Sequence, residues 1–385
     1  MRERTIAIVG GGAAGNAAAR TLVGHGFEGR VLIIGETGVA PYNRTLVDKG
    51  LMTGLLTAEQ TALPPAEGAE RLLDTALGFD ASGSSVRLAS GVEVHFDAAI
   101  VATGSRPRLL DTAIPGLAHA VAAGRVTTLH SARDAEAIRD SLSSGPHRVS
   151  ILGAGLVGSE AASLLREAGH QITLIARART PLVPVLGRAI AEHVADLHRR
   201  HVTTRFGRTA AAFKPRSDRV DMLLDDGEAI ESDLVIVAHG TVPSAPAPLA
   251  GRGLVVDDRL RLEGEASVYA AGGVAVLPFS DGRRLRIDHW DDAAAQGAHA
   301  ARSLLHDLGR IGDPGPYGPS SRFSIRTHGT TIAGAGIAVP DAVERTASEE
   351  PLITVFETAE GTSTGVVGVN AARQIHGWST KLHRP

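Results

Sequence analysis

The segment TIAIVGGGAAG, residues 5–15, decides the fold, because a short apolar run passes directly into a glycine-rich turn. Its glycines, Gly10, Gly12 and Gly15, fit the pattern G-x-G-x-x-G. The alanine-rich stretch that follows, as far as about His25, predicts a helix, and residues 31–34 predict a second buried strand. A strand, a helix and a second strand in this order form a βαβ unit, which predicts a parallel sheet covered by helices.

Each glycine of this turn has its own role in binding a dinucleotide. Gly10 allows the tight turn, Gly12 lets a diphosphate approach the backbone, and Gly15 lets the helix pack on the strand. Ala14 lies where unpaired N–H groups and the positive end of the helix favour phosphate. Glu36 ends the second strand, where a carboxylate would accept hydrogen bonds from ribose hydroxyls. We therefore predict a nucleotide site here, against the alternative of a glycine-rich loop without function.

The segment VSILGAGLVG, residues 149–158, repeats the same pattern. Gly153, Gly155 and Gly158 occupy the three glycine positions, with Leu156 and Val157 between them. A predicted helix to about residue 168 and an apolar strand over residues 172–175 complete a second βαβ unit. Two such units predict two dinucleotide sites rather than a solenoid.

The second unit differs from the first in the residues that end its second strand. Arg177 and Arg179 follow that strand, and no acidic residue is present there. Guanidinium groups bind a 2′-phosphate well, whereas a carboxylate would repel it. This predicts a preference for NADPH, with NADH as the alternative if both arginines are only solvated.

Three further segments predict buried strands that end in glycine turns, and a breaker-rich segment marks a linker. The strands and turns are residues 98–102 before Thr103 and Gly104, residues 234–238 before Gly240, and residues 268–271 before Gly272 and Gly273. Residues 313–319 contain three prolines and two glycines, typical of a linker. Beyond it, residues 323–338, 352–356 and 365–369 predict an antiparallel sheet.

Composition excludes several classes of function. The 385 residues carry a formal net charge of −3 and only 3% aromatic residues, which argues against a nucleic-acid partner. There is no cysteine, so disulfides, iron–sulfur ligation and a redox-active dithiol in this chain are excluded. No apolar stretch approaches the roughly 20 residues that span a bilayer, and no histidine motif predicts a metal site. We expect a soluble, cytoplasmic protein whose redox chemistry is carried by bound organic cofactors.

Four more motifs resemble those of the FAD-dependent pyridine-nucleotide reductases, and among them the ferredoxin reductases of oxygenase systems. Residues 41–49, PYNRTLVDK, resemble the family's PYxRxxLSK loop, and Ala102-Thr103-Gly104 its ATG motif. Residues 286–293, RIDHWDDA, resemble its R-I-E-x-W segment, and residues 268–272 its YAxGD motif. The resemblance covers nearly the whole chain.

The resemblance implies a complete architecture. It implies an α/β fold of the glutathione-reductase type, with two Rossmann-like dinucleotide-binding domains and a small C-terminal α+β domain. Residues 1–107 and 243–312 would form a discontinuous FAD-binding domain, residues 108–242 the NAD(P)H-binding domain, and residues 313–385 the C-terminal interface domain. The first turn would bind FAD and the second NAD(P)H.

The resemblance also implies roles for individual residues. Arg44 and Lys49 would lie near the flavin, with Lys49 paired to Glu160. The remaining cofactor-binding residues that it implies, divided between the two sites, are Ala102, Thr103, Gly104, Gly240, Gly272, Gly273, His289 and Trp290. Lys49, Glu160 and Trp290 would be the catalytic group. The pairing also has independent support, because Glu160 lies on a predicted packed helix, where a buried carboxylate needs a partner.

Two residues depart from the family's pattern. Its third glycine motif ends in an aspartate that hydrogen-bonds the flavin's ribityl chain, and this chain has Gly273 there. Its C-terminal FWSDQ-type stretch has a tryptophan where this chain has Ser324. Losing a charge-assisted hydrogen bond costs about 1.5–3 kcal/mol, so Gly273 predicts weaker FAD binding unless another group compensates.

The function predicted is an NAD(P)H-dependent flavoprotein reductase that passes electrons to a ferredoxin-type carrier. Two alternatives stay open: an FAD and NAD(P)H oxidoreductase that acts directly on a small molecule or oxygen, and a non-catalytic binding protein that retains the fold. The sequence leaves the oligomeric state open.

Overall fold

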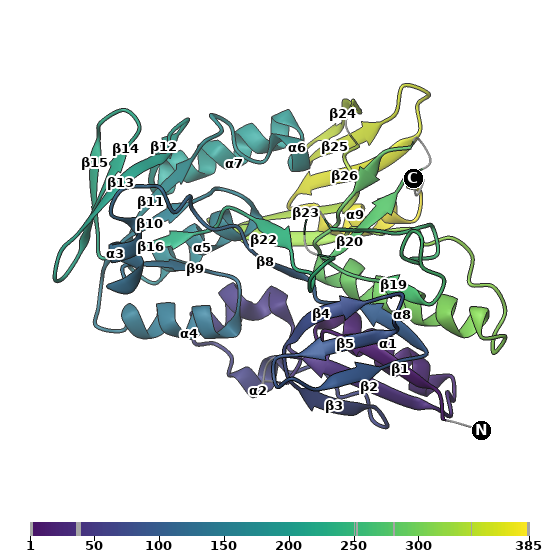
Figure 1. The fold of residues 1–385 in the computed structure, drawn as a ribbon. Coiled ribbons are helices and arrows are strands. Elements are labelled where there is room, and N and C mark those ends of the chain that lie inside the picture. Colours follow the sequence, from purple (N-terminus) through teal and green to yellow (C-terminus); the bar gives the residue numbers. More distant parts are fainter. Residues whose placement is uncertain are drawn as a thin grey trace.

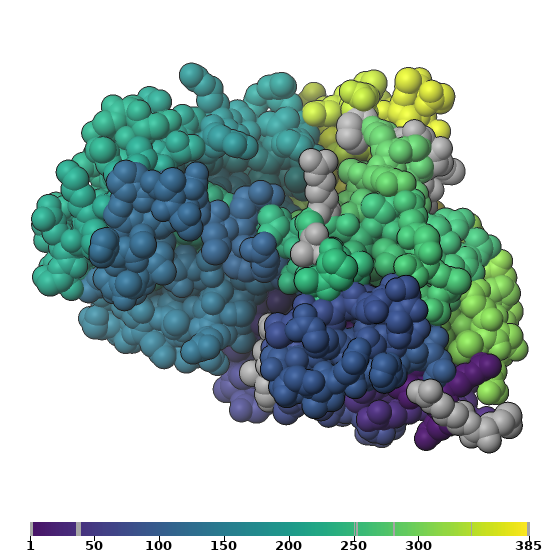
Figure 2. Space-filling model, viewed as in Figure 1, coloured from purple at the N-terminus to yellow at the C-terminus, as the bar shows by residue number. Residues whose placement is uncertain are grey.

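The computed structural model describes residues 3–35, 40–249, 251, 253–279, 282–339 and 341–382. Three larger sheets organise the chain, two of them parallel and one antiparallel. Figure 1 places the parallel sheet built mainly from the N-terminal segment at the lower right, the second parallel sheet at the left and the antiparallel sheet at the upper right. Figure 2 shows the same division at the surface, with the teal middle segment on the left and green and yellow segments on the right.

The first parallel sheet takes strands from two distant parts of the chain. In spatial order its strands are β19 (Val268–Ala270), β7 (Ala98–Val101), β1 (Thr5–Val9), β2 (Arg30–Gly35) and β3 (Glu70–Leu73). The residues of β1, β7 and β19 are buried throughout, as expected for strands covered on both faces. Residues 268–270 therefore complete a sheet whose other strands end by residue 101.

The second parallel sheet is built from one continuous stretch of chain. Its spatial order is β12 (Thr203–Phe206), β11 (Gln171–Ala176), β10 (Arg148–Leu152), β16 (Leu234–Val237) and β9 (Val126–Thr128). The antiparallel pair β8 (Ser105–Pro107) and β17 (Thr241–Pro243) joins this unit to the first. Both connections between the two units thus run side by side.

The antiparallel sheet follows the proline-rich segment. Its spatial order is β22 (Phe323–Thr327), β23 (Thr330–Gly336), β26 (Ser363–Val369), β25 (Leu352–Glu357) and β24 (Val343–Glu349). The sequence analysis does not predict β24, whose residues are almost all exposed and polar at the edge of the sheet. Helix α9 (Ala372–Ser379) packs on β23 and β26.

Helices and smaller sheets cover these layers. The helices are α1 (Ala13–Gly24), α2 (Ala58–Thr61), α3 (Leu117–Ala122), α4 (Ala132–Ser141), α5 (Leu156–Glu167), α6 (Val183–Leu186), α7 (Arg188–His201) and α8 (Trp290–Asp307). Two short helices, the 3-10 turn η1 (Arg44–Leu46) and the π-helical η2 (Val47–Met52), follow residues 40–43. Three-stranded sheets are formed by β4 (Ala76–Asp80), β5 (Ser85–Leu88) and β6 (Glu93–His95), by β13 (Ala210–Pro215), β14 (Val220–Leu224) and β15 (Ala229–Ser232), and by β18 (Leu254–Val255), β20 (Ala275–Pro278) and β21 (Arg284–Leu285).

The close packing of α8 on α1 positions the first glycine turn. A Cβ at Gly297 of α8 would lie 1.9 Å from the carbonyl oxygen of Ala14, so only glycine allows this approach. Among the described residues, every helix is too short or too polar to cross a membrane.

Candidate cofactor and hydride-transfer site

The first glycine turn is shaped by backbone contacts that exclude side chains at two positions and leave the third open. Gly10 has φ +110°, and a Cβ there would lie 2.3 Å from the Ala102 oxygen. A Cβ at Gly15 would lie 1.8 Å from the Gly10 oxygen. At Gly12, by contrast, no atom lies within 4 Å of the Cβ position, so that face of the turn is open to a ligand.

The second turn repeats this geometry. Gly153 has φ +112°, with its Cβ position 2.3 Å from the Ala238 oxygen, and the Cβ position of Gly158 lies 1.9 Å from the Gly153 oxygen. Gly155 again has no atom within 4 Å of its Cβ position. Two turns with the same two closed positions and the same open one provide matched surfaces for a diphosphate.

The helices that follow the turns present free backbone donors. Gly12 and Gly155 are the N-cap residues of α1 and α5, and neither helix has a side-chain cap or an acidic residue in its first turn. The first N–H groups and the positive end of each helix are therefore available to an anion. This fits the diphosphate of FAD or of a nicotinamide dinucleotide.

A cavity of about 410 Å³ lies beside the first turn. It is lined by the two turns that end β1 and β7, by residues after β19 and by the start of α8. The residues predicted for the first site that line it are Gly10, Gly12, Ala14, Arg44, Ala102, Thr103, Gly104, Gly272, Gly273, His289 and Trp290. Glu36, predicted for the ribose, lies outside the described residues.

The walls of this cavity are held by hydrogen bonds between segments distant in sequence. The Thr103 hydroxyl donates to the Ser244 carbonyl, which ties the end of β7 to the chain after β17. Arg44 Nη1 lies 3.0 Å from His130 Nε2. The same His130 Nε2 lies 3.0 Å from the Ser105 carbonyl oxygen, so the ring links Arg44 to the start of β8. Burial and the nearby Arg44 guanidinium lower the pKa of His130.

Trp290 offers an unpaired donor at the same cavity. It is the first residue of α8, and its buried Nε1 has no hydrogen-bond partner among the described residues. Buried indole N–H groups usually have a partner, so this donor fits a ligand with an acceptor atom. His289 precedes it, with its ring 5.8 Å from that of Phe323 in an edge-to-face arrangement.

Lys49 and Glu160 form the ion pair that the resemblance implies. Lys49 Nζ lies 2.9 Å from Glu160 Oε2, and the side chains are 35% and 5% exposed. Glu160 Oε1 also accepts a hydrogen bond of 2.8 Å from the backbone N–H of Arg326. One carboxylate on α5 therefore joins the lysine of η2 to strand β22 of the C-terminal sheet.

Asp48 is a third charged group in this cluster, and the sequence analysis does not identify it. Its side chain is buried, and Asp48 Oδ1 accepts a hydrogen bond from the N–H of Lys49. Burial and the adjacent Glu160 carboxylate raise the pKa of Asp48 to about 7. Two carboxyl groups and one ammonium group thus share a buried cluster, in which Asp48 can hold a proton near neutral pH.

The second site has two exposed arginines beside its turn. Arg177 and Arg179 follow β11 and make no hydrogen bond or ion pair with another residue in the described part of the chain. Two nearby arginines, Arg205 and Arg208, are instead paired with Glu228 and Asp226 at 2.6 Å. The pair predicted to bind a phosphate is the pair left free.

The other residues predicted for the second site surround its turn. Leu156 packs toward the C-terminal sheet, and Val157 is exposed. Gly240 follows β16 with φ +79°, and its carbonyl accepts a hydrogen bond from the N–H of Arg108. Ser324 is exposed on β22.

Two residues that line the cavity, and one that supports its wall, were missed by the sequence analysis. Arg71, at the start of β3, lies with its guanidinium near the Cβ position of Gly11. Gln296 accepts a hydrogen bond from the N–H of Gly272, and Asp288 lies against Gly273. Arg71 and Asp288 line the cavity and Gln296 holds Gly272 in its wall, each by long-range packing that no local motif signals. Within the described ranges, no group of three potential ligands is arranged to hold a metal ion.

Comparisons with known proteins agree with this geometry. The family model described as "Pyridine nucleotide-disulphide oxidoreductase" matches residues 4–297. The chlorobenzene dioxygenase ferredoxin reductase component of Cupriavidus sp. is 30% identical, with 96% of this chain and 90% of the relative covered. The ferredoxin–NAD(+) reductase component of the biphenyl dioxygenase system of Paraburkholderia xenovorans is 28% identical, with 96% and 91% covered.

Solved structures share the fold. The ferredoxin reductase for the CYP199A2 system of Rhodopseudomonas palustris has a TM-score of 0.85 at 24% identity, with 97% of this chain and 93% of that chain covered. The matched segment includes both glycine turns and the ion pair of Lys49 with Glu160. The chain belongs to the pyridine nucleotide-disulphide oxidoreductase family and is an oxidoreductase similar to the ferredoxin reductases of oxygenase systems.

Proposed function

We propose that this protein is an NAD(P)H-dependent flavoprotein reductase that uses bound FAD to deliver electrons to a ferredoxin-type iron–sulfur protein in the cytoplasm. The observation that carries the proposal is the pair of matched glycine turns, each open at its middle glycine and each followed by an uncapped helix. The curated relatives named above are ferredoxin reductase components of dioxygenase systems, which supports ferredoxin as the acceptor.

The proposed domains follow the strand order. Residues 1–107 and 243–312 would form the FAD domain, supported by the pairing of β19 with β7. Residues 108–242 would bind NAD(P)H, and residues 313–385 would form the interface domain. The paired connections β8 and β17 lie at the two proposed boundaries.

In the proposed reaction, the residues of this chain bind, orient and hold charge. When bound, FAD accepts hydride from NAD(P)H and releases electrons singly to a one-electron carrier. The turns at Gly12 and Gly155 hold the two diphosphates, which fixes the two cofactors relative to each other. Glu160 holds Lys49 in one position through their ion pair, and Asp48 holds or releases a proton beside them.

The first experiment is spectroscopic. The purified protein should be yellow, its flavin absorption should bleach on anaerobic addition of NADPH, and the reduced protein should then reduce a ferredoxin in stopped-flow mixing. A colourless protein that cannot be reconstituted with FAD would contradict the proposal and favour a non-catalytic protein. Oxidation of the reduced protein by quinone or oxygen but by no ferredoxin would favour the small-molecule oxidoreductase.

For the nicotinamide cofactor we propose NADPH over NADH. The free guanidinium groups of Arg177 and Arg179 support this choice, although the relative from the biphenyl dioxygenase system is named for NAD(+). The double variant Arg177→Ala/Arg179→Ala should lower kcat/KM for NADPH at least about tenfold and leave that for NADH nearly unchanged. Arg205→Ala, which removes a paired arginine nearby, is the control and should not alter the ratio. Equal or better turnover of NADH by the unmodified protein would contradict the preference.

A further inference from the structure

The residue before Lys49 is a third departure from the family pattern, besides Gly273 and Ser324. The PYxRxxLSK loop has serine where this chain has Asp48, so a carboxyl group replaces a neutral hydroxyl. Asp48 is only 6% exposed, and its Oδ1 accepts a hydrogen bond of 2.9 Å from the N–H of Lys49. Because an ionised carboxylate is costly to bury without a partner, this replacement requires another group that stabilises it.

The carboxyl group of Glu160 is in hydrogen-bond contact with that of Asp48. Glu160 Oε2 lies 2.9 Å from Lys49 Nζ, and Glu160 Oε1 accepts a hydrogen bond from the N–H of Arg326. Two ionised carboxylates have no hydrogen to share, so a hydrogen bond between them requires a proton on one of them. Glu160 already has a cation and a backbone donor, so the proton belongs on Asp48.

In the described part of the chain, the elements packed on η2 bring no second cation to Asp48. Helix α4 faces η2 with apolar side chains, and its Asp134 is bound at the N-terminus of the same helix. The Arg44 guanidinium of η1 contacts a histidine ring instead. The charged groups that act on Asp48 are Glu160 of α5 and the adjacent Lys49. The buried cluster thus contains two carboxyl groups for one ammonium group.

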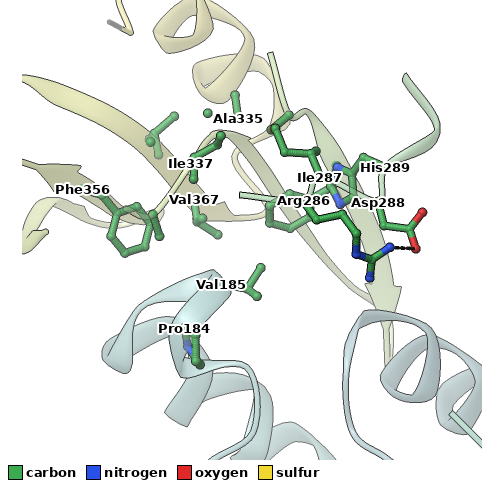
Figure 3. Close-up of a pocket in the computed structure, with 16 residues that line it drawn as sticks. Pro184, Val185, Arg286, Ile287, Asp288, His289, Ala335, Ile337, Phe356 and Val367 are labelled. Carbon is green, nitrogen blue, oxygen red and sulfur yellow. Dashed lines mark ion pairs between the residues drawn. The ribbon is translucent and has the colours of Figure 1, made fainter. Parts of the chain in front are cut away.

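Asp288, beside the cofactor cavity, illustrates a carboxylate that has a cation of its own. Arg286 Nη1 lies 3.1 Å from Asp288 Oδ2, an ion pair drawn in Figure 3. Burial alone would raise the pKa of Asp288, but hydroxyl donors and the Arg286 guanidinium lower it. At Asp48, burial and the Glu160 carboxylate instead raise the pKa to about 7. Asp288 is therefore ionised at neutral pH, whereas Asp48 gains and loses its proton there.

We propose that Asp48 is a positioning residue, whose protonated carboxyl group donates a hydrogen bond to Glu160 and so holds Glu160 and Lys49 in one arrangement. This inference rests on the proposed function, in which that pair serves flavin reduction. When Asp48 loses its proton, the donor is lost and two carboxylates repel each other beside one ammonium group. Lys49 is then attracted by both carboxylates, and Glu160 no longer fixes its position alone.

The consequence for the reaction is a dependence on pH that the serine of the family pattern would not give. Small displacements of a positioned group lower the rate of a reaction. The rate of flavin reduction by NADPH should therefore fall as the pH rises through neutrality and Asp48 ionises.

The first test observes Lys49 directly and needs no activity assay. The chain has three lysines, Lys49, Lys214 and Lys381, so protein made with isotope-labelled lysine gives few side-chain NMR signals, and Lys49→Arg identifies that of Lys49. This signal should shift with a midpoint near pH 7 in the unmodified protein and should not do so in Asp48→Asn. The exposed Lys214 and Lys381 are internal controls, whose signals should be the same in both proteins.

The second test measures the rate of flavin reduction by NADPH in stopped-flow mixing at about pH 6 and about pH 8. The rate in the unmodified protein should fall at least about threefold between them. Asp48→Asn should remove this fall, because asparagine donates a hydrogen bond without ionising. Asp48→Ser, which restores the residue of the family pattern, should do the same, and it decides if Asp48→Asn fails to fold. Asp140→Asn, which removes an exposed carboxylate of α4, is the matched control and should keep the fall.

Three results would overturn the role of Asp48 while leaving the proposed function intact. These are a Lys49 signal that does not shift between the two pH values, a shift that persists in Asp48→Asn, and an equal fall in rate in the unmodified protein and both Asp48 variants. An unmodified protein that binds no FAD would instead overturn the proposed function, and the NMR titration would still show whether Asp48 controls Lys49.

Discussion

At the scale of single residues, Glu160 makes the contacts that join three segments. Its two oxygens bind Lys49 of η2 and the backbone of β22, and almost none of the carboxylate reaches solvent. We predict that Glu160→Gln lowers the rate of flavin reduction by NADPH at least about tenfold, because a buried charge pair loses one partner. Stopped-flow absorbance measures this rate. Glu167→Gln, on the exposed end of the same helix, is the control, and an unchanged rate in Glu160→Gln would exclude a role for the pair.

The raised pKa of Asp48 predicts how the stability of the folded protein depends on pH. Its pKa is about 7 in the folded protein and near 3.8 unfolded, so the folded state binds the extra proton between these values. Stability therefore falls as the pH rises from about 4 to 7, by up to about 1.4 kcal/mol per pH unit. Asp48→Asn keeps the acceptor for the N–H of Lys49 and should be more stable than the unmodified protein at pH 8, with the advantage vanishing near pH 4. Urea unfolding at the two pH values measures this, and equal advantages at both would contradict the raised pKa.

At the scale of elements, the two glycine turns allow a matched pair of substitutions. Gly12 and Gly155 have negative φ angles and open space at the Cβ position, so Gly12→Val and Gly155→Val should fold normally. Each valine would fill the face on which a diphosphate must lie. We predict that Gly12→Val purifies without FAD, whereas Gly155→Val retains FAD and loses binding of NADPH. Absorption spectra and NADPH titration measure the two losses, and the reverse pattern would exchange the proposed assignments.

The secondary-structure elements also show how much of the fold and of the site could be predicted from the sequence. Both βαβ units are predicted because a turn, its glycines and its helix are adjacent in the chain, and their geometry depends on local backbone contacts. Strand β24 is missed because an exposed edge strand carries no apolar alternation. Asp48, Arg71 and Asp288 are missed because their roles depend on side-chain packing between distant segments.

At the scale of the whole molecule, a pair of histidines joins the middle unit to the C-terminal sheet. His198 of α7 lies 3.0 Å from His328 in the turn between β22 and β23, and His201 stacks on His328. Burial, with the neighbouring histidines, lowers the pKa of His198 to about 3. Burial, with His201 and Arg166, lowers that of His328 to about 4. Both rings are neutral in the folded protein under ordinary conditions.

This pair predicts loss of stability in acid. Between the folded pKa values and the unfolded value of 6.5, the unfolded state binds more protons, so stability falls as the pH decreases. Each histidine contributes up to about 1.4 kcal/mol per pH unit in this window. Asparagine tolerates the positive φ of 48° at residue 328, so His328→Asn should fold. In this variant, the slope of the free energy of unfolding against pH between 5.5 and 4.5 should lose about half of the pair's contribution. Urea unfolding at intermediate pH measures the slope, and an unchanged slope would exclude the pair as its source.

The pairing of β19 with β7 also sets an order for folding during translation. The strands of the second parallel sheet all lie between residues 126 and 237, so that sheet is complete in the nascent chain before residue 268 leaves the ribosome. Until then β7 presents an open edge with unpaired backbone groups, although β1, β2 and β3 emerged first. The first parallel sheet, whose strands are synthesised earliest, is thus completed after the second parallel sheet. Until β19 pairs with it, the exposed edge of β7 leaves the growing polypeptide open to chaperones or to misassociation.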